Sequence, residues 1–263
     1  MSTIVFENVW KEYGDTIVLE QIDIEIKPAS FVALVGPSGC GKTTFLRMLL
    51  GEERSSRGRI LVDQVPLTPE PDKDRGVVFQ RYSVFPHLTV LDNVLVGLEF
   101  ASSKFVGRLF GAARRSAALE ASTILASVGL TGHESKYPAA LSGGMQQRLA
   151  LAQALIMKPK ILLLDEPFGA LDPGIRADIH TLMLDLWQET GMTVVMVTHD
   201  LSEAFRLGTR VIALERKRKR PEEIQRYGAQ IQQDIEVWPK KQPRLLNGTG
   251  HAPSMALPLE THP

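Results

Sequence analysis

A glycine-rich segment directly after a short apolar run constrains the fold of this chain more than any other feature. The apolar run is Phe31–Val35, and the chain continues as Gly36-Pro-Ser-Gly-Cys-Gly-Lys-Thr-Thr44. Five successive apolar residues are typical of a strand that is buried on both faces. The glycines allow the backbone to wrap closely around phosphate groups, with its amides and the N-terminal end of a following helix directed at them. The pattern therefore predicts a phosphate-binding loop between a buried strand and a helix at 43–50.

The positions within this loop have separate expected roles in an ATP site. Lys42 is expected to reach the β- and γ-phosphates, and the Thr43 hydroxyl is expected to bind Mg²⁺. Thr44 is placed to contact the α-phosphate. The loop residues expected to surround the phosphates are Gly36, Pro37, Ser38, Gly39, Cys40 and Gly41. Cys40 is interpreted as a small residue that fits the loop, and because it is the single cysteine no internal disulfide can form.

A second apolar run ends in two acids, in the segment Lys160-Ile-Leu-Leu-Leu-Asp-Glu-Pro167. In a parallel sheet, ligands gather at the carboxyl ends of the strands. Asp165 is therefore expected to hold Mg²⁺, and Glu166 is expected to orient or deprotonate an attacking water. The alternative, a strand that simply ends in solvent-facing acids, is disfavoured because the same chain carries the phosphate loop.

Strand and helix patterns alternate along much of the chain. Strands are expected at the apolar runs 160–164, 193–197 and 210–214. A helix is expected from Pro173, which suits the first helical position, to Thr190, with Asp172 as its cap. Strands that alternate with helices predict an α/β fold with a largely parallel sheet. Between about residues 88 and 157 helical spacing dominates, which predicts a helical insert within this fold.

The segment Leu141-Ser-Gly-Gly-Met-Gln-Gln-Arg148 carries the most specific pattern of the chain. Ser142 can cap the helix that follows, while Gly143 and Gly144 expose its first amides, which makes an anion site without a lysine. The segment resembles the signature sequence of ATP-binding-cassette (ABC) ATPases, and the chain is identified as a member of that family. The resemblance implies that two cassettes pack head to tail and that each signature covers the γ-phosphate held by the other chain.

The resemblance extends over residues 6 to 214 and implies roles for four further residues. Gln80, in Val-Val-Phe-Gln, matches the glutamine that joins the sheet body to the helical insert and senses Mg²⁺ and the attacking water. Asp172, in Gly-Ala-Leu-Asp, matches the loop that crosses the dimer interface. His199, in Val-Thr-His-Asp, matches the switch histidine that contacts the γ-phosphate. Tyr13, in Lys-Glu-Tyr-Gly, matches the aromatic residue that stacks on adenine.

The family fold implied by the resemblance is an α/β phosphate-loop NTPase core with a largely parallel sheet. An N-terminal antiparallel β-subdomain and an inserted α-helical subdomain at about 88–157 complete it. We expect this domain to cover residues 1–239 and the tail 240–263, which has four prolines and no apolar period, to be disordered. One departure is the segment 216–238, which does not follow the short hairpin in which such cassettes usually end.

The family resemblance also implies a function, which is ATP hydrolysis with Mg²⁺ that powers transport through separate permease subunits. No apolar stretch reaches the roughly 18 residues of a membrane helix, and the first residues do not resemble a signal peptide. We therefore expect a peripheral protein at the cytoplasmic face of the inner membrane. The expected docking surface is the groove beside Gln80 that includes residues 81–89, and the alternative is that Tyr82, Phe85 and Leu88 of this segment are ordinary core residues. Other expected partners are a second copy or a homologous cassette and, indirectly, a periplasmic substrate-binding protein.

Particular segments of the sequence indicate the transporter subtype, and others bear on the two alternative classes, a soluble ABC ATPase and a nucleotide kinase. Phe168-Gly-Ala-Leu-Asp172 and Val90-Leu-Asp-Asn-Val94 resemble the nitrate, sulfonate and taurine importer ATPases, whereas residues 226–239 resemble cassettes linked to urea- or guanidine-type compounds. A soluble ABC ATPase of DNA repair or translation usually has two cassettes or a long coiled-coil insert, and a nucleotide kinase has no use for the signature. With 30 basic and 30 acidic residues, the charge balance gives no reason to expect nucleic acid as the main partner.

Overall fold

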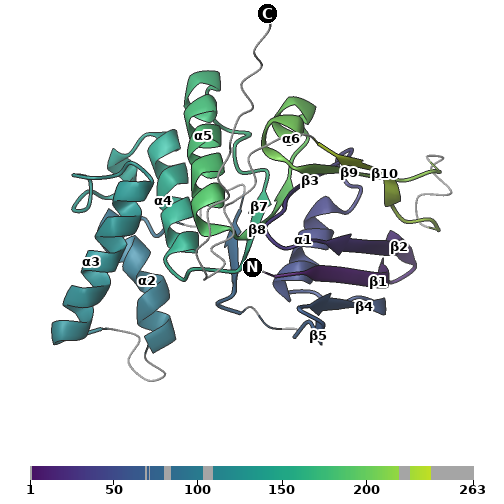
Figure 1. Cartoon of the computed structure of the whole chain (residues 1–263), viewed down its shortest axis with the longest axis horizontal. Coiled ribbons are helices and arrows are strands. Elements are labelled where there is room, and N and C mark those ends of the chain that lie inside the picture. Colours follow the sequence, from purple (N-terminus) through teal and green to yellow (C-terminus); the bar gives the residue numbers. More distant parts are fainter. Residues whose placement is uncertain are drawn as a thin grey trace, which may run out of the picture.

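Two sheets form the framework of the chain (Figure 1). The computed structural model describes residues 2–68, 70, 72–79, 84–102, 109–218 and 226–237. Within these ranges the chain forms ten strands, six α-helices and one 3-10 turn, at Pro138–Ala140. The tail 240–263 lies outside the described residues, and its expected disorder stays a prediction, as do the expected domain bounds.

The first sheet is antiparallel and comes from the N-terminal part of the chain. Its strands are β1 (Ile4–Tyr13), β2 (Thr16–Ile26), β4 (Arg57–Val62) and β5 (Val65–Pro66), in the order β2-β1-β4-β5. In β2, Ile22, Ile24 and Ile26 are buried, while the acidic residues between them are exposed. Because successive side chains of a strand point to opposite faces, this alternation buries one face of the sheet and leaves the other in solvent.

The second sheet is largely parallel and carries the sequence motifs at its carboxyl edge. Its strands are β3 (Phe31–Val35), β6 (Arg75–Val78), β7 (Ile161–Asp165), β8 (Thr193–Val197), β9 (Arg210–Glu215) and β10 (Gln230–Glu236), in the order β10-β9-β3-β8-β7-β6. Only β10 pairs antiparallel, and it returns along β9 after the connection 216–229. The sequence did not indicate this strand, because β10 is a polar, largely exposed edge strand without an apolar pattern.

The six described helices are α1 (Lys42–Leu50), α2 (Val90–Ser102), α3 (Gly111–Ser127), α4 (Gly143–Leu155), α5 (Pro173–Thr190) and α6 (Leu201–Leu207). Five of them, α2 to α6, cover one face of the parallel sheet, and α1 and the antiparallel sheet cover the other. Figure 1 shows α4 and α5 on one side of β7 and β8, with α2 and α3 beyond them. On the other side α1 lies between the two sheets, and its apolar residues share a buried cluster with both.

The side chains of β3 explain why its sequence is continuously apolar. Phe31, Ala33 and Val35 pack in the cluster that includes the helices α2 to α6. Val32 and Leu34 point the opposite way and pack with α1 and the antiparallel sheet. All five residues are at most 4% exposed, so the prediction of a strand buried on both faces is confirmed.

Helix α5 has the predicted bounds but not the predicted cap. Pro173 occupies the first turn, and Asp172 is at the N-cap position with extended backbone angles. The Asp172 side chain, however, makes no hydrogen bond to the helix amides, so the expectation of a side-chain cap is wrong. Among the described residues, no helix is both long enough and apolar enough to cross a membrane.

Candidate nucleotide-binding and hydrolysis site

The phosphate loop joins the carboxyl end of β3 to the start of α1. The Lys42 side chain is buried against this loop, and its Nζ donates to the carbonyl oxygens of Gly36 at 2.9 Å and Pro37 at 3.1 Å. An ammonium group forms stronger hydrogen bonds with charged oxygens than with neutral carbonyls. The loop therefore holds a cation at the position where the sequence predicts contacts to phosphate groups, and that role stays a prediction.

Two glycines of the loop are required by contacts that the sequence does not display. A Cβ atom on Gly36 would lie 2.1 Å from the carbonyl oxygen of Leu214, at the end of β9. A Cβ on Gly41, which has φ +101°, would lie 2.9 Å from Cγ1 of Val18 and 2.8 Å from Cδ2 of Leu19. The loop is thus enclosed between β9 and β2, and Val18 is a neighbour of the site that no motif identified.

The two residues expected to bind Mg²⁺ meet although they are far apart in the chain. Oγ1 of Thr43 donates to Oδ1 of Asp165 at 3.3 Å, which joins the start of α1 to the end of β7. Burial raises the pKa of Asp165 above its usual range, more than its bond to Thr43 lowers it. The described residues contain no cluster of three or more side chains that could hold a metal ion alone. The Thr43 hydroxyl and the Asp165 carboxylate are oxygen ligands of the kind that Mg²⁺ takes, and one or two such protein ligands with phosphates and water complete its shell.

The pKa of Asp165 leads to a prediction for Asp165→Asn. We expect the thermal midpoint of the nucleotide-free chain to rise by roughly 1–3 °C at pH 7, because the variant no longer buries a charge. Because the pKa is raised in the folded state, the ionised carboxyl opposes folding only above the unfolded pKa. The difference in thermal midpoint between Asp165→Asn and the wild type should therefore vanish as the pH falls below about 3.9. Added Mg²⁺ and ATP should stabilise the wild type more than the variant.

Differential scanning fluorimetry across the pH range measures these midpoints. Asp178→Asn, which changes an exposed acid on α5, is the matched control and should leave the midpoint and its pH dependence unchanged. A lower midpoint for Asp165→Asn at pH 7 would contradict the prediction, because it would mean that the ionised carboxylate stabilises the nucleotide-free fold.

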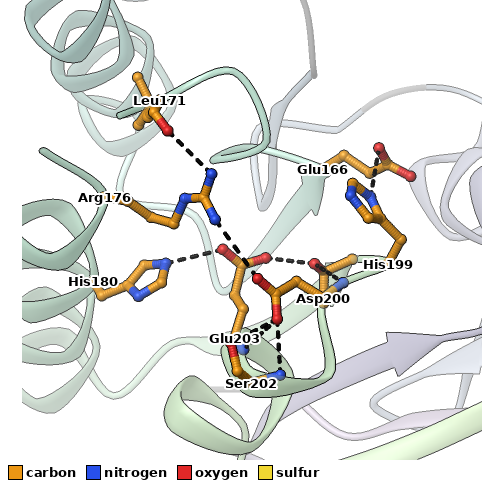
Figure 2. Close-up of polar contacts among 9 residues, drawn as sticks. Glu166, Leu171, Arg176, His180, His199, Asp200, Ser202 and Glu203 are labelled. Carbon is orange, nitrogen blue, oxygen red and sulfur yellow. Dashed lines mark hydrogen bonds and ion pairs between the residues drawn. The ribbon is translucent and has the colours of Figure 1, made fainter. Parts of the chain in front are cut away.

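Glu166 and His199 meet at the carboxyl ends of β7 and β8 (Figure 2). Nδ1 of His199 lies 3.2 Å from Oε2 of Glu166, and the imidazole is largely exposed while the carboxylate is half-buried. The backbone of Glu166 has φ 45°, a conformation that costs free energy for a residue with a side chain, and its amide donates to the carbonyl oxygen of Val197 at 2.9 Å. The structure thus brings together the expected general base and the expected switch histidine.

Tyr13 ends β1 on the side of the phosphate loop. Its hydroxyl donates to the carboxylate of Glu53 and lies beside the Thr44 side chain, and its ring is half-exposed. Nζ of Lys11 lies 4.7 Å from the ring centroid. Burial and the bond to Glu53 raise the pKa of Tyr13 above its usual range. The ring is therefore held near the helix end of the loop, where the base of a nucleotide is expected.

The signature residues lie on a different part of the fold from the phosphate loop. Ser142 caps α4, and its Oγ accepts a hydrogen bond from the amide of Met145 at 3.3 Å. A Cβ on Gly144 would lie 2.4 Å from Cγ2 of Ile175, so this glycine lets the end of α4 approach α5. The buried residues of α4 belong to the cluster on one face of the parallel sheet, whereas those of α1 belong to the cluster on the other. Within one chain, the signature and the phosphate loop therefore lie at separate places.

Two other predicted positions remain to be placed. Gln80, expected to take part in catalysis and in metal binding, lies outside the described residues, as do residues 81–83 of the expected docking segment. Asp172 is exposed at the start of α5. The roles of both residues stay predictions.

The arrangement defines a class of protein. A glycine-rich loop after a buried parallel strand, with an acid pair and a histidine at the ends of the neighbouring strands, is the fold of an α/β phosphate-loop NTPase. Comparison with known proteins narrows this class. Residues 19–169 match the family model described as ABC transporter. The chain therefore belongs to the ABC transporter family of ATP-binding proteins, which confirms the resemblance seen in its signature sequence.

Curated relatives of the chain are ATP-binding proteins of import systems. The "Fe(3+) ions import ATP-binding protein FbpC 1" of Rhizobium meliloti (strain 1021) is 43% identical over 215 residues, which are 81% of this chain and 58% of that protein. The "Aliphatic sulfonates import ATP-binding protein SsuB" of Escherichia coli (strain K12) is 44% identical over 212 residues, which are 81% of this chain and 77% of that protein. The chain thus spans less than two thirds of the length of the first of these relatives.

Solved structures of related cassettes confirm the fold class. The ATP-binding cassette MJ0796, in a dimeric post-hydrolysis state bound to ADP and Pi, superposes with a TM-score of 0.69 at 32% identity. The match covers 90% of this chain and 100% of that one. A second dimeric structure of MJ0796, described as a bacterial ABC transporter cassette, gives a TM-score of 0.72 at 31% identity with the same coverage.

Proposed function

We propose that the chain is the ATP-binding and ATP-hydrolysing subunit of an ABC importer. The observation that carries this proposal is the contact between Thr43 and Asp165, 3.3 Å apart, beside the phosphate loop. A hydroxyl and a half-buried carboxylate in this position fit a phosphate-bound Mg²⁺ and have no evident use in a protein that only binds a neutral ligand. The import systems named for the relatives supply the biological context.

Each residue of the site has a separate proposed role in hydrolysis. Lys42 binds the phosphates, and Thr43 and Asp165 would hold Mg²⁺, which neutralises charge on the phosphates when it is bound. Glu166 accepts a proton from the attacking water, and His199 orients its carboxylate and contacts the γ-phosphate. The left-handed backbone of Glu166 supports this role, because strained residues persist where the surrounding structure fixes a functional geometry.

The base of ATP is proposed to lie between the end of β1 and the start of β2. Tyr13 offers a half-exposed ring for stacking, and Val18 offers an apolar side chain next to Gly41 of the loop. Stacking of a nucleic-acid base on an aromatic ring contributes about 1–3 kcal/mol in other sites. Glu53 holds the tyrosine hydroxyl, so the ring keeps its orientation while the base binds and leaves.

A complete site is proposed to need a second copy or a homologous cassette. Ser142, Gly143 and Gly144 form an anion-binding helix end that lies on the other face of the sheet from α1. A head-to-tail dimer places this helix end over the phosphates of the partner, with Asp172 near the interface. The dimeric structures of MJ0796, one of them bound to ADP and Pi, support this arrangement.

The permease is proposed to dock in a groove between the parallel sheet and the helical insert. The groove has a volume of 320 Å³ and is lined by Phe79, Phe85, Asn93, Val96 and Met157, among others. Its neighbours 80–83 lie outside the described residues. Docking here would hold the chain as a peripheral subunit at the cytoplasmic face of the inner membrane. The permease would receive substrate from a periplasmic binding protein on the opposite face.

The sulfonate type of importer is the proposed subtype. The resemblance of Phe168-Gly-Ala-Leu-Asp172 to the nitrate, sulfonate and taurine ATPases supports it, as does the 44% identity to the sulfonate ATP-binding protein over most of that protein's length. The substrate itself contacts other subunits, so this chain contributes only the coupling of ATP hydrolysis to transport.

Purification of the tagged chain from its own cell tests the proposed function. We expect a membrane permease to copurify, and the purified material to hydrolyse ATP only when Mg²⁺ is present. Phosphate release and identification of the copurified proteins are the measurements. Recovery with ribosomes or with DNA and repair proteins would contradict the proposal and would favour a soluble ABC ATPase.

A further inference from the structure

A buried carboxylate connects helices α5 and α6 to one side of the Glu166–His199 pair (Figure 2). Glu203 of α6 is 5% exposed, and both of its oxygens have partners. The hydroxyl of Thr198 donates to Oε2 at 2.5 Å, and Nε2 of His180 lies 2.9 Å from Oε1. Thr198 immediately precedes His199 in the chain. A single carboxylate therefore attaches the residue before the switch histidine to the middle of α5.

Arg176 makes a second link from α5, one turn closer to the start of the helix. Its Nη2 donates to the carbonyl oxygen of Leu171 at 3.0 Å, and its Nη1 lies 3.6 Å from Oδ2 of Asp200. Leu171 belongs to the loop 169–172 that leads into α5, and Asp200 directly follows His199. Figure 2 shows the guanidinium between these two groups. Arg176 thereby connects the loop 169–172 to Asp200, the residue that follows the switch histidine.

The other hydrogen bonds of Asp200 favour the charged form of its carboxylate, which faces Arg176. Oδ1 accepts from the amide of Ser202 at 2.8 Å, from its hydroxyl at 2.6 Å and from the amide of Glu203 at 3.3 Å. The bonds from Ser202 hold the pKa of Asp200 below its usual range, followed by smaller effects that include Arg176. The carboxylate thus caps α6 with one oxygen and faces Arg176 with the other.

His180 also contacts the segment that follows β7. The rings of Phe168 and His180 are 4.9 Å apart and inclined at 70°, and Phe168 is fully buried two residues after Glu166. Within the described part of the chain, Nδ1 of His180 has no hydrogen-bond partner. The imidazole is therefore positioned by Glu203 on one side and by Phe168 on the other, so that it touches both segments that carry the catalytic pair.

These contacts make the position of His199 depend on α5. Glu203 is buried, and a buried polar group that loses its partner costs about 1–3 kcal/mol, or more when it is charged. We therefore expect a displacement of His180 to be passed through Glu203 to Thr198 rather than to break either bond. A displacement of about 1 Å between reacting groups can lower a rate by about 10²-fold. A shift of α5 would thus be felt at the 3.2 Å contact between His199 and Glu166.

We propose that Glu203 is a positioning residue for hydrolysis, which acts through Thr198 to hold His199 opposite Glu166. His180 and Arg176 anchor this geometry to α5 and to the loop 169–172. The inference rests on the proposed ATPase activity and extends it, because it links the catalytic pair to the loop expected at the dimer interface. In the described structure the hydrogen bonds and ion pairs of the Glu203, Thr198, His180 and Arg176 side chains do not reach the phosphate loop. We therefore expect their effect to fall on the hydrolysis step and not on ATP binding.

Thr198→Val and Thr198→Ser form the main test. Valine has the shape of threonine but cannot donate to Glu203 or accept from the amide of Asp200, whereas serine can do both. We expect Thr198→Val to lower kcat by about tenfold with less than about a twofold change in KM for ATP. Thr198→Ser should retain most of the wild-type kcat. Thr181→Val, on the exposed face of α5, is the matched control and should behave as wild type.

The possible results for these variants distinguish failure of the positioning role from failure of the proposed ATPase function. Wild-type kcat in Thr198→Val would overturn the positioning role while leaving the ATPase proposal intact. Equal losses in the valine and serine variants, or a rise in KM that matches the fall in kcat, would also overturn it. Absence of Mg²⁺-dependent hydrolysis by the wild type, alone and with any copurified permease, would remove the proposed function and this inference with it.

Arg176→Met provides a second variant in case Thr198→Val does not fold. The Arg176 side chain is 30% exposed, and methionine keeps much of its length without the charged donors. We expect kcat to fall about threefold to tenfold while KM and the thermal midpoint stay close to the wild type. A wild-type kcat in a folded Arg176→Met protein would overturn the link between the loop 169–172 and His199.

Discussion

Glu166→Gln is expected to slow ATP hydrolysis by roughly 10²–10⁴-fold while ATP binding is retained. Glutamine has nearly the same shape as glutamate and can keep a hydrogen bond to His199, but it cannot accept a proton from water. The substitution does not touch the bond of Lys42 to the phosphate loop or the Thr43–Asp165 pair. The variant should therefore hold ATP in the closed dimer that we propose to precede hydrolysis.

Three measurements check this expectation. Phosphate release gives kcat, a fluorescent ATP analogue gives the dissociation constant, and light scattering during gel filtration with ATP gives the oligomeric state. Glu189→Gln is the matched control, because it changes an exposed carboxylate at the far end of α5. Unimpaired turnover in Glu166→Gln would remove Glu166 from the role of general base, and loss of ATP binding would point to a structural role for its carboxylate.

The parts of the site that the sequence predicts are those defined by residues close together in the chain. The glycines and Lys42 belong to one loop, and the strand before them is recognisable because five adjacent residues are apolar. Asp165 and Glu166 are identified in the same way, by their place at the end of an apolar run. Local patterns of this kind depend only on backbone geometry and burial, so they can be interpreted without the fold.

The contacts that depend on the fold were not visible in the sequence. Gly144 was interpreted as exposing helix amides, but its lack of a side chain also admits Ile175 of α5, 31 residues further along. His180 is a polar residue on the buried side of α5, and its partner Glu203 comes from α6. Asp172 shows the opposite case, because its position suggested a cap that its side chain does not make. Neither periodicity nor spacing determines which side chains meet across different elements.

The buried polar residues do leave one signal in the sequence. His180 follows Ile179 and precedes Met183, both fully buried, so a polar side chain interrupts an apolar face of α5. Such an interruption predicts a hydrogen-bond partner for the polar side chain, since buried polar groups are almost always hydrogen-bonded. The sequence alone could have raised that question, although only the structure identifies Glu203 and Thr198 as the answer.

Ser142→Arg is expected to abolish ATP hydrolysis while ATP binding by the isolated chain stays nearly unchanged. Ser142 is the cap of α4 and lies on the opposite face of the sheet from α1, which follows the phosphate loop. An arginine there would fill the proposed anion site with a bulky cation, next to the positive end of the helix. Loss of the cap alone costs about 1 kcal/mol, which the fold should survive. The variant should therefore bind ATP as a monomer and fail to close the dimer.

Two controls separate the anion site from general damage. Ser142→Ala removes the cap without adding a cation and should retain part of the activity, whereas Ser122→Arg makes the same change at an exposed serine of α3 and should be active. The measurements are nucleotide affinity, oligomeric state with ATP, and phosphate release. If Ser142→Arg abolished ATP binding by the monomer, the signature would act on the nucleotide of its own chain, and the head-to-tail dimer would be wrong.

Mixing two inactive variants gives the sharpest form of this prediction. Lys42→Ala lacks the phosphate-binding cation but has an intact signature, while Ser142→Arg has an intact loop and a blocked signature. If each site takes its loop from one chain and its signature from the other, a mixed dimer contains one complete site and one with both defects. Equal mixing of a symmetric dimer should then restore activity to about a quarter of the wild-type sites. If both halves of the site came from the same chain, the mixture would stay inactive, because no chain in it would carry an intact loop together with an intact signature.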